Sequence, residues 1–204
     1  MTPTYILRPM TTDDIPQVVK IDQASFTTPW SARTYEFEIN NRESSHLVVI
    51  EVVEPHLPRL DGWRGLAARL KPPAAAPGPI AGYGGCWLIA GEAHISTIAV
   101  APEYRGRGLG ELLLAAMLKR SINRQGPYSV LGVRASNEVA QALYRKYRYE
   151  VVGRRRGYYR DDGEDALLME VRPLDEAYRQ ALDARLKALR ERLDYVDQFT
   201  GAEW

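Results

Sequence analysis

The residues best suited to chemistry lie between positions 98 and 110, where an apolar stretch gives way to an arginine- and glycine-rich loop. The stretch Ile98-Ala99-Val100 ends at a proline turn, and Arg105-Gly106-Arg107-Gly108-Leu109-Gly110 then opens into an apolar, helix-forming segment. Such a loop directs several backbone N–H groups to one place, at the positive end of the helix dipole. The glycines let a ligand approach the backbone closely, and Arg105 and Arg107 can add charge-assisted hydrogen bonds. The spacing therefore predicts a phosphate-binding loop.

Other phosphate-binding loops fit this sequence less well. The chain has no Gly-x-x-x-x-Gly-Lys-Ser/Thr segment, which is the pattern of the nucleoside-triphosphate P-loop. It also lacks the dinucleotide-binding pattern, a Gly-x-Gly-x-x-Gly segment after a first strand with an acidic residue about twenty positions further on. Taken by itself, the glycine-rich loop could also be an ordinary helix N-terminus without a ligand.

The elements that must position this loop do not follow a strict strand–helix alternation. Apolar and β-branched runs predict strands at 5–8, 46–53, 80–89, 93–100, 129–134, 150–153 and 166–171. Apolar spacing and capping residues predict helices that begin near residues 15 and 31 and others that span 109–123 and 138–147. Hairpins join several strands, for example at Ala90-Gly91-Glu92, so the sequence predicts a mixed α/β fold.

Two segments lie outside this pattern. Residues 54–79 hold six prolines and no long periodic stretch, so we expect an insertion between strands, with a short helix near 63–70. It is either a plain surface loop or a lid over the substrate. Residues 174–199 carry apolar side chains at steps of four and three from Leu182 to Val196, which predicts an amphipathic helix. Its apolar face packs on its own domain or forms a dimer seam, so a monomer or a homodimer is expected.

Composition and charge argue against several classes of protein. The chain has 204 residues, 45% of them hydrophobic, a net charge of +1 and a single cysteine, Cys86. The charge gives no indication of a DNA or membrane partner, and one cysteine rules out an intrachain disulfide framework. His46 and His56 lack metal-ligand spacing, so no metal is expected. Without a secretory signal or an apolar stretch of about 20 residues, a cytoplasmic protein is expected.

The loop and several further motifs resemble the GNAT acyltransferases. Arg105–Gly110 matches the Arg/Gln-x-x-Gly-x-Gly/Ala acetyl-CoA loop of that family. Other segments extend the resemblance to the bacterial ribosomal-protein-alanine N-acetyltransferase subgroup. They are Phe26-Thr27-Thr28-Pro29-Trp30-Ser31, Glu92–Val100, Val133-Arg134-Ala135-Ser136-Asn137, Ala142-Leu143-Tyr144, Arg156-Gly157-Tyr158-Tyr159 and Glu164-Asp165-Ala166.

This resemblance implies a GNAT fold, an α/β (α+β) arrangement in which helices flank a central, twisted, mixed and mostly antiparallel sheet. The acetyltransferase domain would span residues 1–172, including the insertion 54–79, and residues 173–204 would form a C-terminal amphipathic helix. The implied activity is acetyl transfer from acetyl-CoA to a primary amine. The favoured acceptor is the α-amine of a peptide or protein N-terminus, for instance of a ribosomal protein. The alternatives are a GNAT enzyme for a small amine or amino acid and a non-catalytic acyl-CoA-binding protein.

The resemblance also implies roles for individual residues. The donor's pantetheine arm would lie along Ile98, Ala99 and Val100, and its pyrophosphate against Arg105, Gly106, Arg107, Gly108, Leu109, Gly110 and the helix start at Glu111. Asn137 would contact the donor, although asparagine is also a favoured helix N-cap. Tyr144 would protonate the departing thiolate, which suits a phenol with a pKa of about 10; its alternative role is core packing. Trp30, Tyr158 and Tyr159 would line the acceptor side.

The base is where the chain departs from the subgroup. An ammonium cannot attack a thioester, so a base or a water chain must first take its proton. The subgroup has a glutamate in its Leu-Glu-Val-Arg strand, whereas this chain has Gly132 in Leu131-Gly132-Val133-Arg134. Glu92 and His94, two residues apart and so on one strand face, are the substitute candidates. His94 has the more suitable ordinary pKa, about 6.5. Alternatively, both are polar residues at a hairpin edge.

A second departure is Lys146-Tyr147-Arg148-Tyr149, where the family has a Leu-Gly-Phe turn. Arg148 replaces the helix-ending glycine, so it must accept a left-handed conformation or reshape the turn. Three arginines, Arg154 to Arg156, follow soon after. They form a solvated face, or else they contact an acidic peptide or ribosomal RNA.

Overall fold

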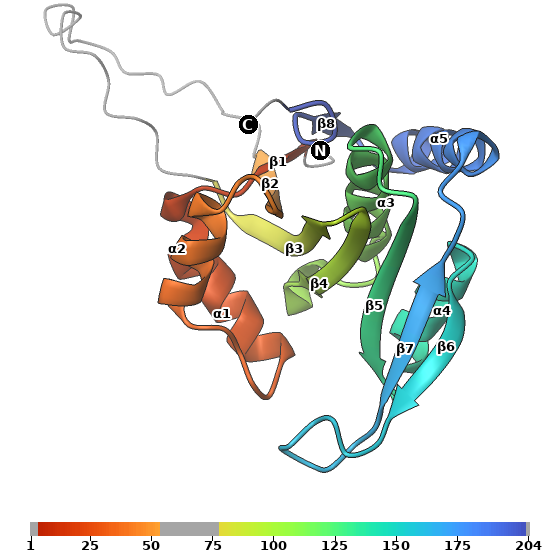
Figure 1. Cartoon of the computed structure of the whole chain (residues 1–204). Coiled ribbons are helices and arrows are strands. Elements are labelled where there is room, and N and C mark those ends of the chain that lie inside the picture. Colours follow the sequence, from red (N-terminus) through yellow and green to blue (C-terminus); the bar gives the residue numbers. More distant parts are fainter. Residues whose placement is uncertain (1–3, 54–77, 203–204) are drawn as a thin grey trace, which may run out of the picture.

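The computed structural model describes residues 4–53 and 78–202. Figure 1 shows one twisted sheet with helices on both of its faces. The eight strands of the described residues lie in the order β6-β7-β5-β4-β3-β2-β1-β8. The pairs β4/β5 and β1/β8 are parallel and the others are antiparallel. The expected α/β fold, with a mixed and mostly antiparallel sheet, is confirmed.

The strands agree closely with the expected ranges. They are β1 (Thr4–Pro9), β2 (Ser45–Val53), β3 (Ile80–Ile89), β4 (Glu92–Val100), β5 (Tyr128–Arg134), β6 (Glu150–Arg155), β7 (Ala166–Val171) and β8 (Tyr195–Asp197). The helices are α1 (Ile15–Ser25), α2 (Ala32–Asn40), α3 (Leu109–Asn123), α4 (Glu138–Lys146) and α5 (Glu176–Arg192). Side-chain caps begin three of these helices, because Ser31, Asn137 and Asp175 each accept a hydrogen bond from the backbone N–H three residues on.

Each face of the sheet buries its own core. Helices α1 and α2 cover one face, where Val18, Tyr35 and Val49 are fully buried. Helices α3, α4 and α5 cover the other face (Figure 1). Every residue from Leu112 to Leu118 of α3 is buried, because this helix is apolar on all sides there. The core therefore fixes α3, and with it the glycine-rich loop at its start.

The C-terminal segment differs from the expected single amphipathic helix at 173–204. Helix α5 ends at Arg192, and Tyr195–Asp197 form strand β8 instead of a continued helix. Aromatic and β-branched residues favour a strand here, and the edge of β1 offers unpaired backbone groups. The backbone N–H of Tyr5 donates to the Asp194 carbonyl oxygen at 2.9 Å. The leucines of α5 pack on the chain's own core, with Leu182 and Leu189 buried.

The proline-rich insertion lies almost entirely outside the described residues. The short helix expected near 63–70, and the choice between loop and lid, therefore stay predictions. The described end of this segment is fixed to the sheet: the backbone N–H of Gly78 donates to a Glu51 carboxylate oxygen at 2.9 Å, and that of Ile80 to Gln17 at 3.0 Å. In the part of the chain that is described, no helix is long and apolar enough to cross a membrane.

Candidate active site

Strands β4 and β5 separate half-way along β4, in front of the glycine-rich loop. Their parallel pairing ends at Ile95 and Leu131 in the described sheet. A β-bulge accompanies the separation, because Ser96 lies between the residues that pair with Cys86 and Gly85 of β3 and has no partner of its own. Beyond the bulge, β4 pairs with β3 alone and β5 with β7 alone. Two strand edges therefore face each other without ladder hydrogen bonds.

The glycine-rich loop turns the chain from the end of β4 into α3. Gly106 and Gly108 have φ angles of +76° and +88°, which L side chains rarely adopt, and Gly108 is the N-cap of α3. Leu109 is buried and anchors the helix start in the core. A Cβ built on Gly110 would lie 3.8 Å from a Val100 methyl group, so the helix start packs closely on the strand end.

The two arginines of the loop bind to neighbouring protein groups. The Arg105 guanidinium donates to the Val100 carbonyl oxygen at 3.0 Å and to the Ser25 hydroxyl at 3.2 Å. Arg107 donates to the Glu103 carbonyl oxygen at 2.9 Å. Both arginines are on exposed parts of the loop. They hold the loop in shape and leave positive charge beside the first amides of α3.

The Glu111 carboxylate faces α4 and α5 rather than the loop. It accepts from the Tyr147 hydroxyl at 3.1 Å, and Lys146 and Arg192 lie 2.6 Å and 3.5 Å from its two oxygens. Burial would raise the pKa of Glu111, but Lys146 and the other donors outweigh it and lower the pKa. An ionised carboxylate would repel a phosphate, so only the backbone N–H of Glu111 suits the expected pyrophosphate contact.

Tyr144 lies on α4 and packs against the core on the α3 side of the sheet. Its ring lies 5.9 Å from that of Tyr149. Burial, with Tyr159 nearby, raises the pKa of Tyr144 to about 12. The phenol therefore keeps its proton at neutral pH and can serve as an acid. At the start of the same helix, the Asn137 side chain accepts from the Ala140 N–H at 3.1 Å, so the N-cap role of Asn137 is present.

Aromatic side chains line the α1/α2 side of the paired end of β4. The indoles of Trp30 and Trp87 are stacked, with centroids 6.2 Å apart and planes 7° apart. The Trp87 ring lies edge-on to His94 at 5.3 Å, and the His94 Nδ1 atom lies 3.9 Å from a Glu92 carboxylate oxygen. A cavity of about 290 Å³ opens here, lined by Trp87, Ile89, Ala90, Glu92, His94 and Tyr128.

His94 has the protonation state that a base needs. Burial lowers its pKa below the ordinary 6.5, an effect that Glu92 opposes and Arg155 reinforces. The imidazole is therefore neutral at pH 7 and can accept a proton. Glu92 also accepts a hydrogen bond from the Tyr128 hydroxyl at 3.2 Å. The structure thus brings Glu92 and His94 close together, and Trp87 connects them to Trp30. Their roles in catalysis and substrate binding stay predictions.

A buried carboxylate that sequence reasoning missed positions Trp30. Asp22, on α1, is 2% exposed and accepts from the backbone N–H of Trp30 at 2.6 Å. It also accepts from the Tyr83 hydroxyl, which in turn accepts from Tyr35 at 2.9 Å. An aspartate in the apolar face of a predicted helix was the available signal. This network fixes the loop between α1 and α2 above the sheet.

Arg134, at the end of β5, was also missed as a functional residue. Its guanidinium lies 2.6, 2.9 and 3.1 Å from carboxylate oxygens of Asp161, Asp162 and Glu164 in the β6–β7 loop. The same group donates to the Thr27 hydroxyl of the α1–α2 loop at 3.0 Å. One arginine therefore ties the α1–α2 loop to the β6–β7 loop. The acidic run after Tyr159 was the sequence signal.

The two predicted tyrosines of the β6–β7 loop differ in their surroundings. The Tyr159 ring lies 3.9 Å below the Arg134 guanidinium, so it belongs to the site. Tyr158 is 52% exposed and packs edge-on against Tyr159, with Arg155 near its ring. Among the described residues, no group of three or more His, Cys, Asp or Glu side chains is arranged to hold a metal ion.

Comparison with known proteins decides the family. Residues 15–148 match the acetyltransferase (GNAT) family. This chain belongs to the GNAT family. The matched residues include the bulged strand β4, the glycine-rich loop and Tyr144, so the geometry described above is that of a GNAT acetyltransferase.

Similar proteins cover most of this GNAT chain. A Bacillus subtilis (strain 168) protein named "Putative ribosomal protein bS18-alanine N-acetyltransferase" is 34% identical over 165 residues, which are 81% of this chain and 93% of that protein. An N-alpha-acetyltransferase of Saccharolobus solfataricus is 32% identical over 83% of this chain and 93% of its own. The crystal structure of the Escherichia coli ribosomal-protein-S18-alanine N-acetyltransferase has 26% identity and a TM-score of 0.63, covering 83% and 94% of the two chains. We conclude that the chain is an N-acetyltransferase.

The two departures from the family pattern have different consequences. Gly132 is exposed on the open face of β5, and a Cβ built there would meet nothing within 4 Å, so space for a side chain exists. Arg148 has a φ of +62°, which is the left-handed conformation that the family glycine would adopt. The Tyr149 N–H bonds to the Tyr144 carbonyl oxygen at 3.1 Å, so the helix-ending turn keeps its usual form.

Proposed function

We propose that this GNAT protein transfers the acetyl group of acetyl-CoA to the α-amine of a protein N-terminus. The separation of β4 from β5 in front of the glycine-rich loop carries the proposal, because a free strand edge and a set of helix amides suit one long donor that ends in phosphates. The names of the relatives support the acceptor, since they include N-alpha-acetyltransferases and ribosomal-protein-alanine acetyltransferases.

The residues of the site fit acetyl-CoA in three respects. The edge of Ile98, Ala99 and Val100 that faces β5 can bond to the amides of a pantetheine arm as a neighbouring strand would. At the bulge, the Ser96 hydroxyl is buried and has no hydrogen-bond partner among the described residues, so it can bond to a polar group of the donor. The amides of residues 106–110 converge at the start of α3, where a pyrophosphate is favoured.

Two side chains would move the protons of the reaction. The amine nitrogen attacks the thioester carbonyl carbon, the C–S bond breaks, and the sulfur takes a proton from Tyr144, whose phenolate regains a proton from solvent. His94 accepts the proton of the amine through a water, since its Cα is two residues, about 7 Å, along the strand from Ser96. Glu92 lies two residues further from the bulge and orients His94. When the amine enters as an ammonium, one proton is released to solvent overall.

The acceptor class can be tested with a panel of amines. We expect free CoA to be released rapidly with an alanine-terminated peptide, and at least tenfold more slowly with spermidine, free alanine or the same peptide blocked at its α-amine. Faster release with a polyamine or a free amino acid would favour a small-amine enzyme. Tight binding of acetyl-CoA without release on any amine would make the chain an acyl-CoA-binding protein.

A further inference from the structure

The C-terminal helix ends beside the glycine-rich loop. Helices α3 and α5 run antiparallel: Arg179 near the start of α5 bonds to Asn123 at 3.2 Å, and Asp183 lies 2.5 Å from Lys119. The last residue of α5, Arg192, therefore reaches the first turn of α3. A Cβ built on Gly108 would lie 3.7 Å from the Arg192 Nη2 atom. The arginine thus borders the positive end of the α3 dipole.

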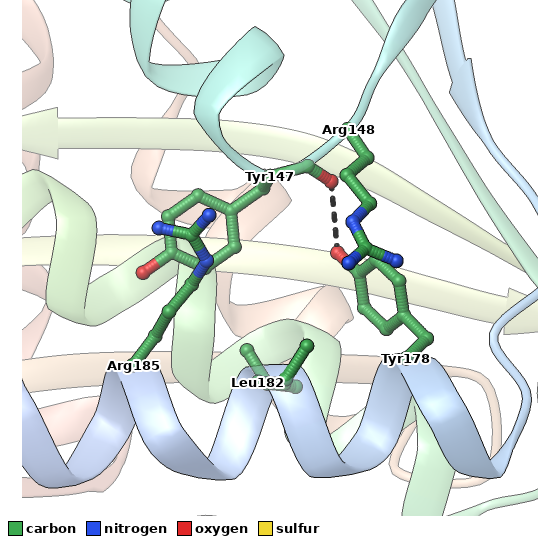
Figure 2. Close-up of a pocket in the computed structure, with 6 residues that line it drawn as sticks. Tyr147, Arg148, Tyr178, Leu182 and Arg185 are labelled. Atoms are coloured by element: carbon green, nitrogen blue, oxygen red, sulfur yellow. Dashed lines mark hydrogen bonds between the residues drawn. The ribbon is translucent and has the colours of Figure 1, made fainter.

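Positive charge exceeds negative charge at this junction. Lys146 and Arg192 share the single carboxylate of Glu111. Figure 2 shows two further guanidinium groups at the same end of α4: Arg185 over the ring of Tyr147 and Arg148 beside the ring of Tyr178. Their distances to these ring centres are 5.3 Å and 5.9 Å. Around Glu111 itself lie three of these cations: Lys146, Arg192 and Arg185, the last over the ring of the tyrosine that donates to Glu111. Three cations around one carboxylate favour an anion as a further partner.

Arg192 is also available to a ligand. Its contact with Glu111 is 3.5 Å long, which is beyond a normal charge-assisted hydrogen bond, and its side chain is 60% exposed. A guanidinium has five N–H donors, so a single long ion pair leaves most of them unused. The Leu193 side chain, next in the chain, is largely buried and fixes the backbone from which Arg192 projects.

We propose that Arg192 binds a phosphate group of acetyl-CoA, so that the C-terminal segment completes the donor site. This inference rests on the proposed use of acetyl-CoA. Two groups of the donor share the required chemistry, the pyrophosphate at the loop and the 3′-phosphate of the ribose. Lys146 stands beside Arg192 and reinforces the same anion site.

The test is a calorimetric comparison of how tightly the wild-type chain and its variants bind CoA and 3′-dephospho-CoA. We expect Arg192→Ala to weaken CoA binding about tenfold, while Lys187→Ala, which removes one exposed positive charge from the same helix, changes the dissociation constant less than twofold. If the tenfold loss disappears with 3′-dephospho-CoA, Arg192 binds the 3′-phosphate; if it persists, Arg192 binds the pyrophosphate.

Other outcomes would contradict the proposal. Equal dissociation constants for the wild-type chain and Arg192→Ala with both ligands would show that Arg192 only pairs with Glu111. Equal losses in Arg192→Ala and Lys187→Ala would show a general field effect rather than a contact. Arg192→Gln, which removes the charge but keeps a polar side chain that suits a helix, repeats the comparison if the alanine variant unfolds at a lower temperature. A wild-type chain that binds neither ligand would instead contradict the proposed function.

Discussion

At the scale of single residues, Tyr144 is the group whose surroundings best match a catalytic role. It is held in an apolar position on α4 with its proton retained, because burial raises its pKa to about 12. We predict that Tyr144→Phe lowers kcat about 10²- to 10⁴-fold, the usual contribution of a general acid. The measurement is the rate of CoA release at saturating peptide. The dissociation constant for CoA should stay within twofold, since the ring is retained; a normal kcat would exclude the acid role.

As the proposed base, His94 would give the reaction a pH dependence. Its pKa lies below 6.5 through burial, so the neutral base predominates at pH 7 and is lost as the pH falls through that lowered pKa. We predict that kcat/KM of the wild-type chain is flat above pH 7 and declines on acidification below about 6.5. His94→Gln should lower kcat/KM about 10²-fold and remove this acid limb. An unchanged pH profile in the variant would show that another group is the base.

Gly132 offers the matched control for that variant. A side chain fits at this position without contact, on the face of β5 that also carries Tyr128. We expect Gly132→Glu to leave the wild-type rate within threefold but to raise the rate of His94→Gln at least tenfold, because the new carboxylate can replace the lost imidazole as base. A large gain in the wild-type background would mean instead that the native base is ineffective. Steady-state rates of the four chains distinguish these results.

At the scale of elements, the end of α4 stores strain. Arg148 is left-handed, which costs an L residue roughly 1–2 kcal/mol. Glycine removes this cost but loses chain entropy on folding and gives up the contact with Tyr178. We predict that Arg148→Gly raises the free energy of unfolding by about 0.5–1 kcal/mol. Urea denaturation measures the change, and Arg148→Ala should give no increase because alanine keeps the strained φ.

Strand β8 is the element that local sequence could not reveal. Its partner β1 lies at the other end of the chain, and the four-three spacing of apolar residues continues from α5 into it. The pattern therefore predicts one helix, whereas pairing with the free edge of β1 decides the structure. By contrast, the hairpin at Ala90-Gly91 could be predicted, because a glycine-containing turn separates two adjacent strand-like runs. Both residues adopt positive φ angles in the structure, as a two-residue turn requires.

The stability of this C-terminal segment depends on Phe199, which is fully buried against the α3 side of the sheet. We predict that Phe199→Ala lowers the free energy of unfolding by about 3–5 kcal/mol, the usual cost of emptying a buried aromatic site. Val196, 48% exposed on β8, is the control, and its replacement by alanine should cost less than about 1 kcal/mol. Similar losses for both would show that β8 unfolds separately from the core.

The glycine-rich loop shows why part of the site could be predicted. Its arginines, glycines and following apolar helix are adjacent in sequence, so their joint geometry is local. The Arg134 cluster and the Asp22 network join segments that are 27 to 107 and 8 to 61 residues apart, respectively. Only the folded sheet brings such residues together, and no local pattern contains that information.

At the scale of the whole molecule, the two faces of the sheet carry different parts of the proposed site. The α3 face carries the donor loop, Tyr144 and the C-terminal helix, while the α1/α2 face carries the aromatic side chains around His94. The separation of β4 and β5 connects the two faces. Arg134 ties the α1–α2 loop to the β6–β7 loop beside this separation.

The central claim is acetylation of a protein N-terminus, and product mapping tests it most directly. A peptide with an N-terminal alanine and an internal lysine offers both kinds of amine to the same enzyme. After incubation with acetyl-CoA, tandem mass spectrometry locates the acetyl group. We predict a single acetyl group on the α-amine of the alanine. Acetylation of the lysine alone, or none on a peptide while spermidine is acetylated, would contradict the claim.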